Sequence, residues 1–175
     1  MSGKETPMRF ASIVQDDISN GDGLGEVLFV QYCSHRCPGC QNPSTWDKDG
    51  GYPFTEKYLE IILDYFRYNP IASRLTLSGG DPLDNIEESL YVAKAFKKEF
   101  PGKKLWIYTG YDFEYLLSES KYTEILSLCD ILVDGEFHVK ERDTTLYCRG
   151  SANQRVIDVP KTLASGNIVI HEEDH

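Results

Sequence analysis

Three cysteines in one short stretch are the residues whose types and spacing point most clearly to chemistry. Cys33, Cys37 and Cys40 lie within eight positions, in the pattern C-x3-C-x2-C, and directly follow the apolar run 27–30. Thiolates this close together can converge on one soft metal centre, and their spacing differs from the paired C-x2-C motifs of structural zinc sites. An iron–sulfur cluster is the first candidate. Since such a cluster usually takes four thiolates, three would leave one iron open, and we expect the chemistry at that iron.

The loop alone leaves two other interpretations open. One is a structural zinc site completed by His35, Cys129 or Cys148, because three cysteines and one histidine form an established zinc set. The other is a disulfide with a spare thiol, although nothing marks the chain as secreted. We do not assign His35 as a ligand, since its cysteine neighbours are enough. Cys129 precedes an apolar run and is expected to be a core thiol, whereas Cys148 is either an ordinary cysteine or one with a redox or partner role.

The composition is that of an ordinary globular protein. With 175 residues, 41% of them hydrophobic, the chain is expected to form a single domain over 1–175, with 1–10 and about 160–175 peripheral. Its 28 acidic and 18 basic residues give a net charge of -10, so we expect no nucleic-acid partner. The sequence contains no apolar run of about 18 residues and no signal segment. We therefore expect no membrane partner and a soluble, cytoplasmic protein.

The hydrophobic pattern predicts alternating strands and helices. Apolar runs predict strands at 26–31, 75–78, 105–109 and 131–133, and amphipathic spacing predicts helices between them, at about 55–69, 84–100 and 112–129. Thr55, Asp84 and Asp112 are the expected N-caps, with Glu87 as the capping-box partner of Asp84. After residue 135 the pattern weakens: a short strand is expected to open 136–147, and an edge strand is expected at 155–159.

This order of elements indicates an α/β fold with a parallel sheet and right-handed crossovers. In such sheets, sites form at the carboxyl ends of the strands. The loop 33–40, the stretch 79–81, the pair 109–110 and Asp134 all follow strands directly. We therefore expect them on one rim, where a single bound molecule could touch all four.

Several short motifs around these segments resemble the radical S-adenosylmethionine (SAM) superfamily. The C-x3-C-x2-C loop after a strand and the Gly-Gly-acid stretch at 79–81 carry that resemblance. Further motifs are similar to those of the activating proteins of anaerobic (class III) ribonucleotide reductases: NG at 20–21, CQNPSTW at 40–46, SGGDPL at 78–83, WIYTGY at 106–111, VDG at 133–135 and RGSANQ at 149–154. Gly39 stands where many superfamily members carry an aromatic residue, just before the third cysteine. The activating proteins also have Pro-Gly there, as Pro38 and Gly39 do, which narrows the resemblance to them. It covers about residues 10–155.

The resemblance implies a partial, open β/α barrel with a parallel sheet and outer helices. It also implies that Cys33, Cys37 and Cys40 hold a 4Fe-4S cluster, whose open iron takes the amino and carboxylate groups of SAM. Gly39, Cys40 and Gln41 would then lie against the adenosine part. Gln41 stands where family members often have tyrosine.

The other strand ends receive their expected roles from the same resemblance. Gly79 and Gly80 would offer backbone groups to the methionine ammonium of SAM, because side chains would block the approach. Asp81 would either face that ammonium or cap the next turn. Thr109 and Asp134 match positions that form a cation or methionine-carboxylate site, and hydrogen bonding at the strand ends is the alternative for both.

The implied activity needs no acid or base side chain, so no catalytic residue is expected beyond the cofactor ligands. The family cleaves SAM reductively, and the resulting 5'-deoxyadenosyl radical takes a hydrogen atom from one glycine of the reductase large subunit. A flavodoxin-like protein would donate the electron. Two rival functions remain open: activation of another glycyl radical enzyme, of the pyruvate formate-lyase type, and a noncatalytic iron–sulfur or zinc protein.

Overall fold

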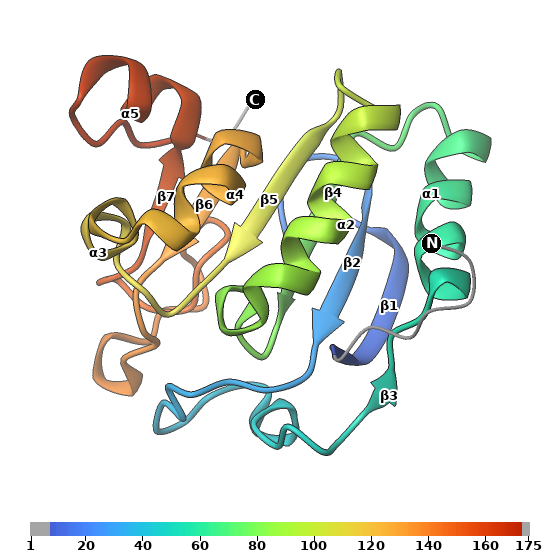
Figure 1. The fold of residues 1–175 in the computed structure, drawn as a ribbon. Coiled ribbons are helices and arrows are strands. Elements are labelled where there is room, and N and C mark those ends of the chain that lie inside the picture. The colour runs from blue at the N-terminus through green and yellow to red at the C-terminus, as the bar shows by residue number, and fades with distance from the viewer. Residues whose placement is uncertain (1–7, 173–175) are drawn as a thin grey trace.

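The computed structural model describes residues 8–172, which form one mixed sheet flanked by helices (Figure 1). What was expected of residues 1–7 and 173–175 lies outside the described residues. The sheet has seven strands in the order β3-β1-β2-β4-β5-β6-β7. The strands are β1 Arg9–Asp17, β2 Gly25–Val30, β3 Tyr52–Pro53, β4 Arg74–Gly79, β5 Lys104–Tyr108, β6 Ile131–Asp134 and β7 Arg155–Asp158. The α-helices are α1 Glu56–Tyr68, α2 Ile86–Glu99, α3 Phe113–Ser118, α4 Thr123–Leu128 and α5 Val159–Ser165.

The centre of the sheet is parallel, as the alternation of strands and helices predicted. β2 pairs with β4, β4 with β5 and β5 with β6, all in parallel register. The outer strands β1 and β7 run antiparallel to their neighbours. The sheet is open, since β3 and β7 are its two edges. The parallel core of the predicted fold is present. The partial barrel of the radical SAM type stays a prediction.

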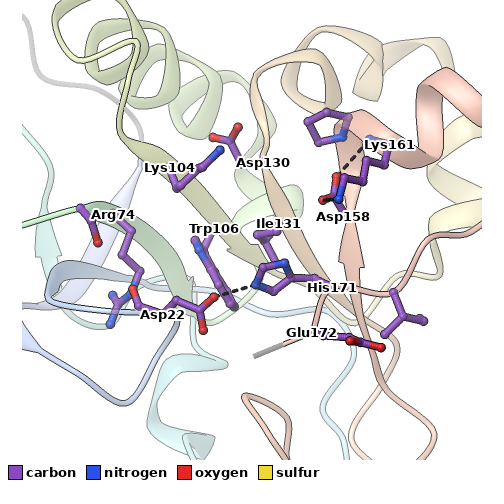
Figure 2. A pocket seen from close by; sticks show the side chains of 13 residues that line it. Asp22, Arg74, Lys104, Trp106, Asp130, Ile131, Asp158, Lys161, His171 and Glu172 are labelled. Carbon is purple, nitrogen blue, oxygen red and sulfur yellow. Dashed lines mark hydrogen bonds and ion pairs between the residues drawn. The ribbon is translucent and has the colours of Figure 1, made fainter. Parts of the chain in front are cut away.

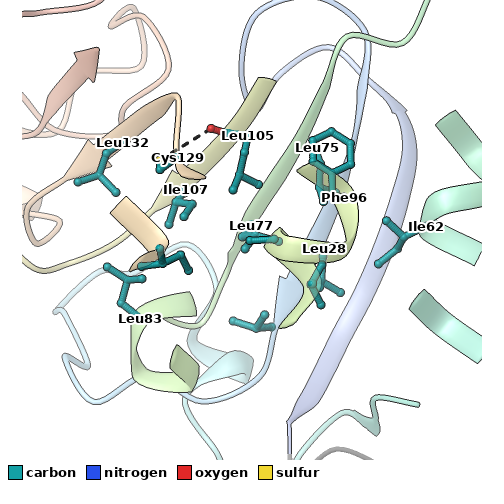
Figure 3. Close-up of a cluster of buried hydrophobic side chains, with 14 of the residues drawn as sticks. Leu28, Ile62, Leu75, Leu77, Leu83, Phe96, Leu105, Ile107, Cys129 and Leu132 are labelled. Carbon is teal, nitrogen blue, oxygen red and sulfur yellow. Dashed lines mark hydrogen bonds between the residues drawn. The ribbon is translucent and has the colours of Figure 1, made fainter. Parts of the chain in front are cut away.

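Alternate residues of the central strands build the main core. Leu28, Leu75 and Leu77 point to the side of the sheet that the helices cover, where Ile62 of α1 and Phe96 of α2 meet them (Figure 3). Each of these side chains is at most 1% exposed, and burying one stabilises the fold by about 1.5–3 kcal/mol. The opposite face of β5, β6 and β7 carries a second, smaller cluster around Trp106. The helices thus cover one face and leave the strand ends to build a site.

The start of α2 differs from the prediction. Its N-cap is Asn85, which makes no side-chain capping bond, so the proposed capping box of Asp84 and Glu87 is wrong. A 3-10 turn, Pro82–Asn85, precedes the helix, and its N-cap is Asp81, whose carboxylate accepts a hydrogen bond from the backbone of Leu83. Because this turn displaces the helix start, Asp84 is free to contact the cysteine loop instead.

Other boundaries fall close to their predicted places. Thr55 and Asp112 are N-cap residues of α1 and α3, although neither makes a side-chain capping bond. The edge strand expected at 155–159 is present as β7. No strand opens 136–147, where the structure has the 3-10 turn Val139–Glu141 and an isolated β-bridge from Arg142 to Ser151. Strands β1 and β3 were not predicted, because half of β1 is exposed and β3 has two exposed residues, so neither shows an apolar run.

No helix in the described part of the chain combines enough length with enough apolar character to cross a bilayer.

Candidate metal and cofactor site

One cavity at the carboxyl ends of the parallel strands contains all three cysteines of the loop. Its volume is about 340 Å³, and Cys33, Cys37 and Cys40 line it together as free thiols. Gln41, Gly79, Gly80, Asp81 and Thr109 also line this cavity. The tertiary structure therefore gathers eight of the ten residues selected from the sequence, which come from three separate strand ends.

A larger cavity, of about 630 Å³, lies at the other end of the strands (Figure 2). Arg74, Lys104 and Ile131, the first residues of β4, β5 and β6, contribute to its lining. It contains no cysteine, and the imidazole of His171 forms an ion pair with Asp22 there, at 2.6 Å between Nε2 and Oδ2. The three cysteines and the other predicted residues that line a cavity therefore belong to the smaller one.

Gly79 and Gly80 bring the ends of β4 and β2 closer together than any other residue would allow. Gly79 has a φ of 98°, and a Cβ at this position would lie 2.6 Å from the backbone N and O of Val30. A Cβ on Gly80 would lie 2.1 Å from the carbonyl oxygen of Tyr32. The backbone N–H groups of Gly80 and Asp81 donate to the carbonyls of Val30 and Tyr32, at 2.7 and 2.8 Å. The chain therefore enters the cysteine loop directly from a strand end that is clamped to β4.

The carboxylate of Asp81 is the centre of the polar network behind the cavity. It is 1% exposed and accepts hydrogen bonds from the backbone of Leu83 and Gly110, both at 2.9 Å. The hydroxyl of Thr109 lies 3.0 Å from both Asp81 oxygens, and Nε2 of His35 donates to Oδ2 at 2.7 Å. The turn-capping role expected of Asp81 and the strand-end hydrogen bonding of Thr109 are thus present. Contact of Asp81 with the ammonium of SAM stays a prediction.

His35, which the sequence analysis weighed as a zinc ligand and did not assign, also lines this cavity. Its side chain is 8% exposed, with Nε2 on Asp81 and Nδ1 on Glu136, at 3.1 Å from Oε1. Burial acts to lower the pKa of His35, but the hydrogen bond and charge of Asp81, together with Glu136, outweigh it and raise the pKa to about 9. A histidine between metal ligands was the available signal, but the carboxylates that hold it come from distant parts of the chain.

The cysteine thiols lie in surroundings that disfavour their charge. Burial raises the pKa of Cys33 to about 11 and also raises the pKa of Cys37. Without metal these two thiols therefore keep their protons at neutral pH. Thiolate ligation would release the protons, so metal uptake at this site is coupled to pH.

The wall opposite the glycines comes from the segment between β6 and β7. Phe137, Leu146, Cys148, Arg149 and Gly150 line the cavity from this side. Burial raises the pKa of Cys148 to about 11, so its thiol is protonated and poorly nucleophilic at neutral pH. The fifth cysteine, Cys129, is 2% exposed and packs in the main core, as predicted.

Two of the predicted residues do not line the cavity. Gly39 has a φ of 76° and packs toward Val139, whose Cγ2 would lie 3.0 Å from a Cβ on residue 39. The carboxylate of Asp134 is 1% exposed and accepts bonds from Phe113 N at 2.8 Å and from Arg155 Nη2 at 2.6 Å. Asp134 therefore has a structural set of partners, and its place in a cation or cofactor site stays a prediction.

The residues around the cavity fit an iron–sulfur cluster and a second, polar ligand. Three free thiols from one loop supply the soft donors that such clusters need. Gly79 and Gly80, the glycine wall, line the same cavity and carry no side chain that would keep a ligand away from their backbone. An α/β protein with this donor set is of the iron–sulfur class.

Comparison with known proteins supports the same class. Residues 19–157 match the protein family described as "4Fe-4S single cluster domain", which spans most of the chain, and the chain belongs to this family.

Curated relatives make the assignment more specific. The anaerobic ribonucleoside-triphosphate reductase-activating protein of Pasteurella multocida (strain Pm70) is 40% identical over 150 residues, which cover 84% of this chain and 95% of the relative. The protein of the same name from Escherichia coli (strain K12) is 39% identical over 143 residues, covering 80% and 92%. The one from Enterobacteria phage T4 is 38% identical over 151 residues, covering 85% and 93%. The chain therefore belongs to the family of anaerobic ribonucleoside-triphosphate reductase-activating proteins.

Proposed function

We propose that this chain activates an anaerobic ribonucleotide reductase by reductive cleavage of SAM at a 4Fe-4S cluster. The observation that carries the proposal is the single cavity in which three free cysteines face the glycine wall of β4, in a chain of this family. In this proposal the fold is the partial, open β/α barrel of the radical SAM type.

Each part of the cavity has a role in this proposal. Cys33, Cys37 and Cys40 hold the cluster and leave one iron open to the amino and carboxylate groups of SAM. The backbone at Gly79 and Gly80, which line the cavity, receives the methionine ammonium, since glycine has no side chain to block the approach. When bound, the cluster supplies the electron that cleaves the C5'–S bond of SAM, giving methionine and a 5'-deoxyadenosyl radical that takes hydrogen from the Cα of a glycine in the reductase.

The protein itself orients the ligands and keeps water away from them. Cys40 and Gln41 border the cavity on the side assigned to adenosine, and Thr109 holds the Asp81 network in place. Phe137 and Leu146 supply apolar surface on the opposite wall. Orientation and exclusion of water are what a protein contributes when the cofactor carries the chemistry.

The partners follow from the geometry of this chemistry. The glycine of the reductase has to reach the cavity, so the rim formed by the cysteine loop and the segment after β6 faces the partner. The cluster also needs an electron from outside, for which we propose a flavodoxin-like donor. The net charge of -10 does not suit a nucleic-acid partner.

Anaerobic reconstitution with iron and sulfide tests this function. The expected result is a reduced cluster whose electron paramagnetic resonance (EPR) signal changes on addition of SAM, together with formation of methionine. Mixing with the reductase large subunit of the same organism, SAM and reductant should then give a glycyl radical doublet. Binding of zinc without a cluster would refute the enzyme, and a doublet formed only with a pyruvate formate-lyase type of partner would refute the named reductase.

A further inference from the structure

His35 belongs to the cysteine loop by sequence, but its side chain is bound to the strand ends behind the loop. Nε2 lies 2.7 Å from Oδ2 of Asp81 and Nδ1 lies 3.1 Å from Oε1 of Glu136. Asp81 and Glu136 follow β4 and β6, so one imidazole joins the loop after β2 to two other strand ends. The position therefore takes a side chain with two polar atoms that point in opposite directions.

The packing around the ring is as specific as its hydrogen bonds. A Cβ on Gly110 would lie 2.7 to 2.8 Å from three atoms of the imidazole, so the ring rests on the bare backbone after β5. The ring of Tyr111 meets it edge-on, with 4.5 Å between the ring centroids. The imidazole therefore packs against both the backbone of Gly110 and the ring of Tyr111.

The carboxylate of Asp81 connects His35 to the residues that follow β5. The same carboxylate that accepts from His35 also accepts from Thr109 and from the backbone of Gly110. Its own backbone N–H donates to the carbonyl of Tyr32, the residue directly before Cys33, at 2.8 Å. The carboxylate of Asp81 thus contacts both the cysteine loop, through His35, and the end of β5, through Thr109 and Gly110.

We propose that His35 is a positioning residue that sets the separation between the three thiols and the glycine wall through Asp81. The inference rests on the proposed function, because that separation decides how well SAM fits between the cluster and Gly79 and Gly80. His35 lines the cavity, but in this proposal it acts through Asp81 and does not ligate the cluster. Residues that orient the groups around a metal site typically change affinity or activity by about 10- to 100-fold when they are removed.

Two conservative variants separate the contacts of the ring. The amide nitrogen of glutamine reaches as far as Nε2, so His35→Gln keeps a donor for Asp81 and loses the one for Glu136. The amide nitrogen of asparagine reaches only as far as Nδ1, so His35→Asn keeps the donor for Glu136 and loses the one for Asp81. His138→Asn is the matched control, since His138 also bonds a carboxylate, Glu141, at 2.9 Å but is 53% exposed and does not line the cavity.

The test measures iron per chain and the dissociation constant for SAM, from the EPR signal of the reduced reconstituted protein. We expect normal iron in all variants, a dissociation constant about tenfold higher for His35→Asn, and a change of less than about threefold for His35→Gln and His138→Asn. Equal values for wild type and His35→Asn would overturn the proposal. So would equal losses in both His35 variants, or a loss of iron that parallels the loss of SAM binding.

Hydrogen exchange of the metal-free chain provides a readout that does not depend on SAM. The amides of residues 33–40 should exchange several-fold faster in His35→Asn than in wild type, with His35→Gln close to wild type. Unchanged exchange in His35→Asn would refute the positioning role. If the wild-type protein shows no response to SAM, the proposed function fails, and this exchange experiment still decides whether His35 positions the loop.

Discussion

Asp134 and Arg155 form a two-point ion pair across the antiparallel strands β6 and β7. Nη2 of Arg155 lies 2.6 Å from Oδ2 of Asp134, and Nε lies 3.1 Å from Oδ1. Arg155 also contacts Glu114 of α3, at 2.7 Å from Oε2, and so joins the edge of the sheet to a helix. The cavity wall that contains Phe137 and Leu146 runs from β6 to β7, so this pair anchors both of its ends.

Replacing Arg155 is therefore expected to destabilise the fold. In Arg155→Ala the carboxylate of Asp134, which is 1% exposed, loses its counter-ion, and this should lower the free energy of unfolding by about 2–3 kcal/mol. Arg155→Lys keeps the charge but loses the two-point geometry, so its free energy of unfolding should lie between those of the wild type and Arg155→Ala. Urea unfolding measures the change. Arg67→Ala is the control, because its ion pairs with two acids of α1 and with Glu99 of α2 lie at the surface and should matter much less. An equal loss in both alanine variants would contradict the prediction.

Removing any one thiol of the loop should abolish cluster assembly. Cys37→Ala leaves two thiols, too few to hold the cluster, so both bound iron and methionine formation should be lost. Iron analysis and the SAM cleavage assay measure this after anaerobic reconstitution. Cys129→Ala should retain iron, because Cys129 lies in the core rather than in the cavity. Retention of cluster and activity by Cys37→Ala would disprove the ligand assignment.

A methyl group on Gly80 should separate the ends of β2 and β4. The Cβ would meet the carbonyl oxygen of Tyr32 at 2.1 Å, and backbone cannot move aside as a flexible side chain can. We expect Gly80→Ala to lower the free energy of unfolding by about 1–3 kcal/mol and to weaken SAM binding. Gly102→Ala is the matched control, since nothing lies within 4 Å of its Cβ position. Calorimetry and SAM titration would contradict the prediction if the two variants behaved alike.

Glu26 should make the stability of the protein depend on pH. Its side chain is fully buried in β2, Oε2 has no hydrogen-bond partner, and burial raises the pKa to about 8 from 4.5, against a weaker opposing hydrogen bond from Gln15. Between these two pH values the folded chain holds a proton that the unfolded chain releases. Stability is therefore lost as the pH rises from about 4.5 to 8.

Glu26→Gln should remove this dependence, because the amide has no proton to lose. Relative to wild type, the variant should gain about 2 kcal/mol or more between pH 5 and pH 8.5. Urea unfolding of the metal-free, reduced proteins at the two pH values measures the gain. A constant difference between wild type and variant across this range would show that Glu26 does not titrate as described.

Much of the fold could be predicted because its signals are local. The apolar runs of β2, β4, β5 and β6 show which segments become buried strands, and the alternation with helices makes them parallel. The exposed half of β1 carries no such signal, since its strand conformation depends on pairing with β2. The short β3 depends in the same way on β1.

The spacing of Cys33, Cys37 and Cys40 by itself determined the donor set that we propose for this protein, because one short loop holds all three thiols. Only the tertiary structure decided which strand ends face that loop. Asp81 forms a hydrogen bond with His35, 46 positions away in the sequence, and lines the cavity. Asp134 forms a hydrogen bond with Arg155 and does not line the cavity. Asp81 follows the parallel strand β4, and Asp134 ends the parallel strand β6. Their partners differ because strand register and loop packing select them. The few residues around each acid encode neither the register nor the packing.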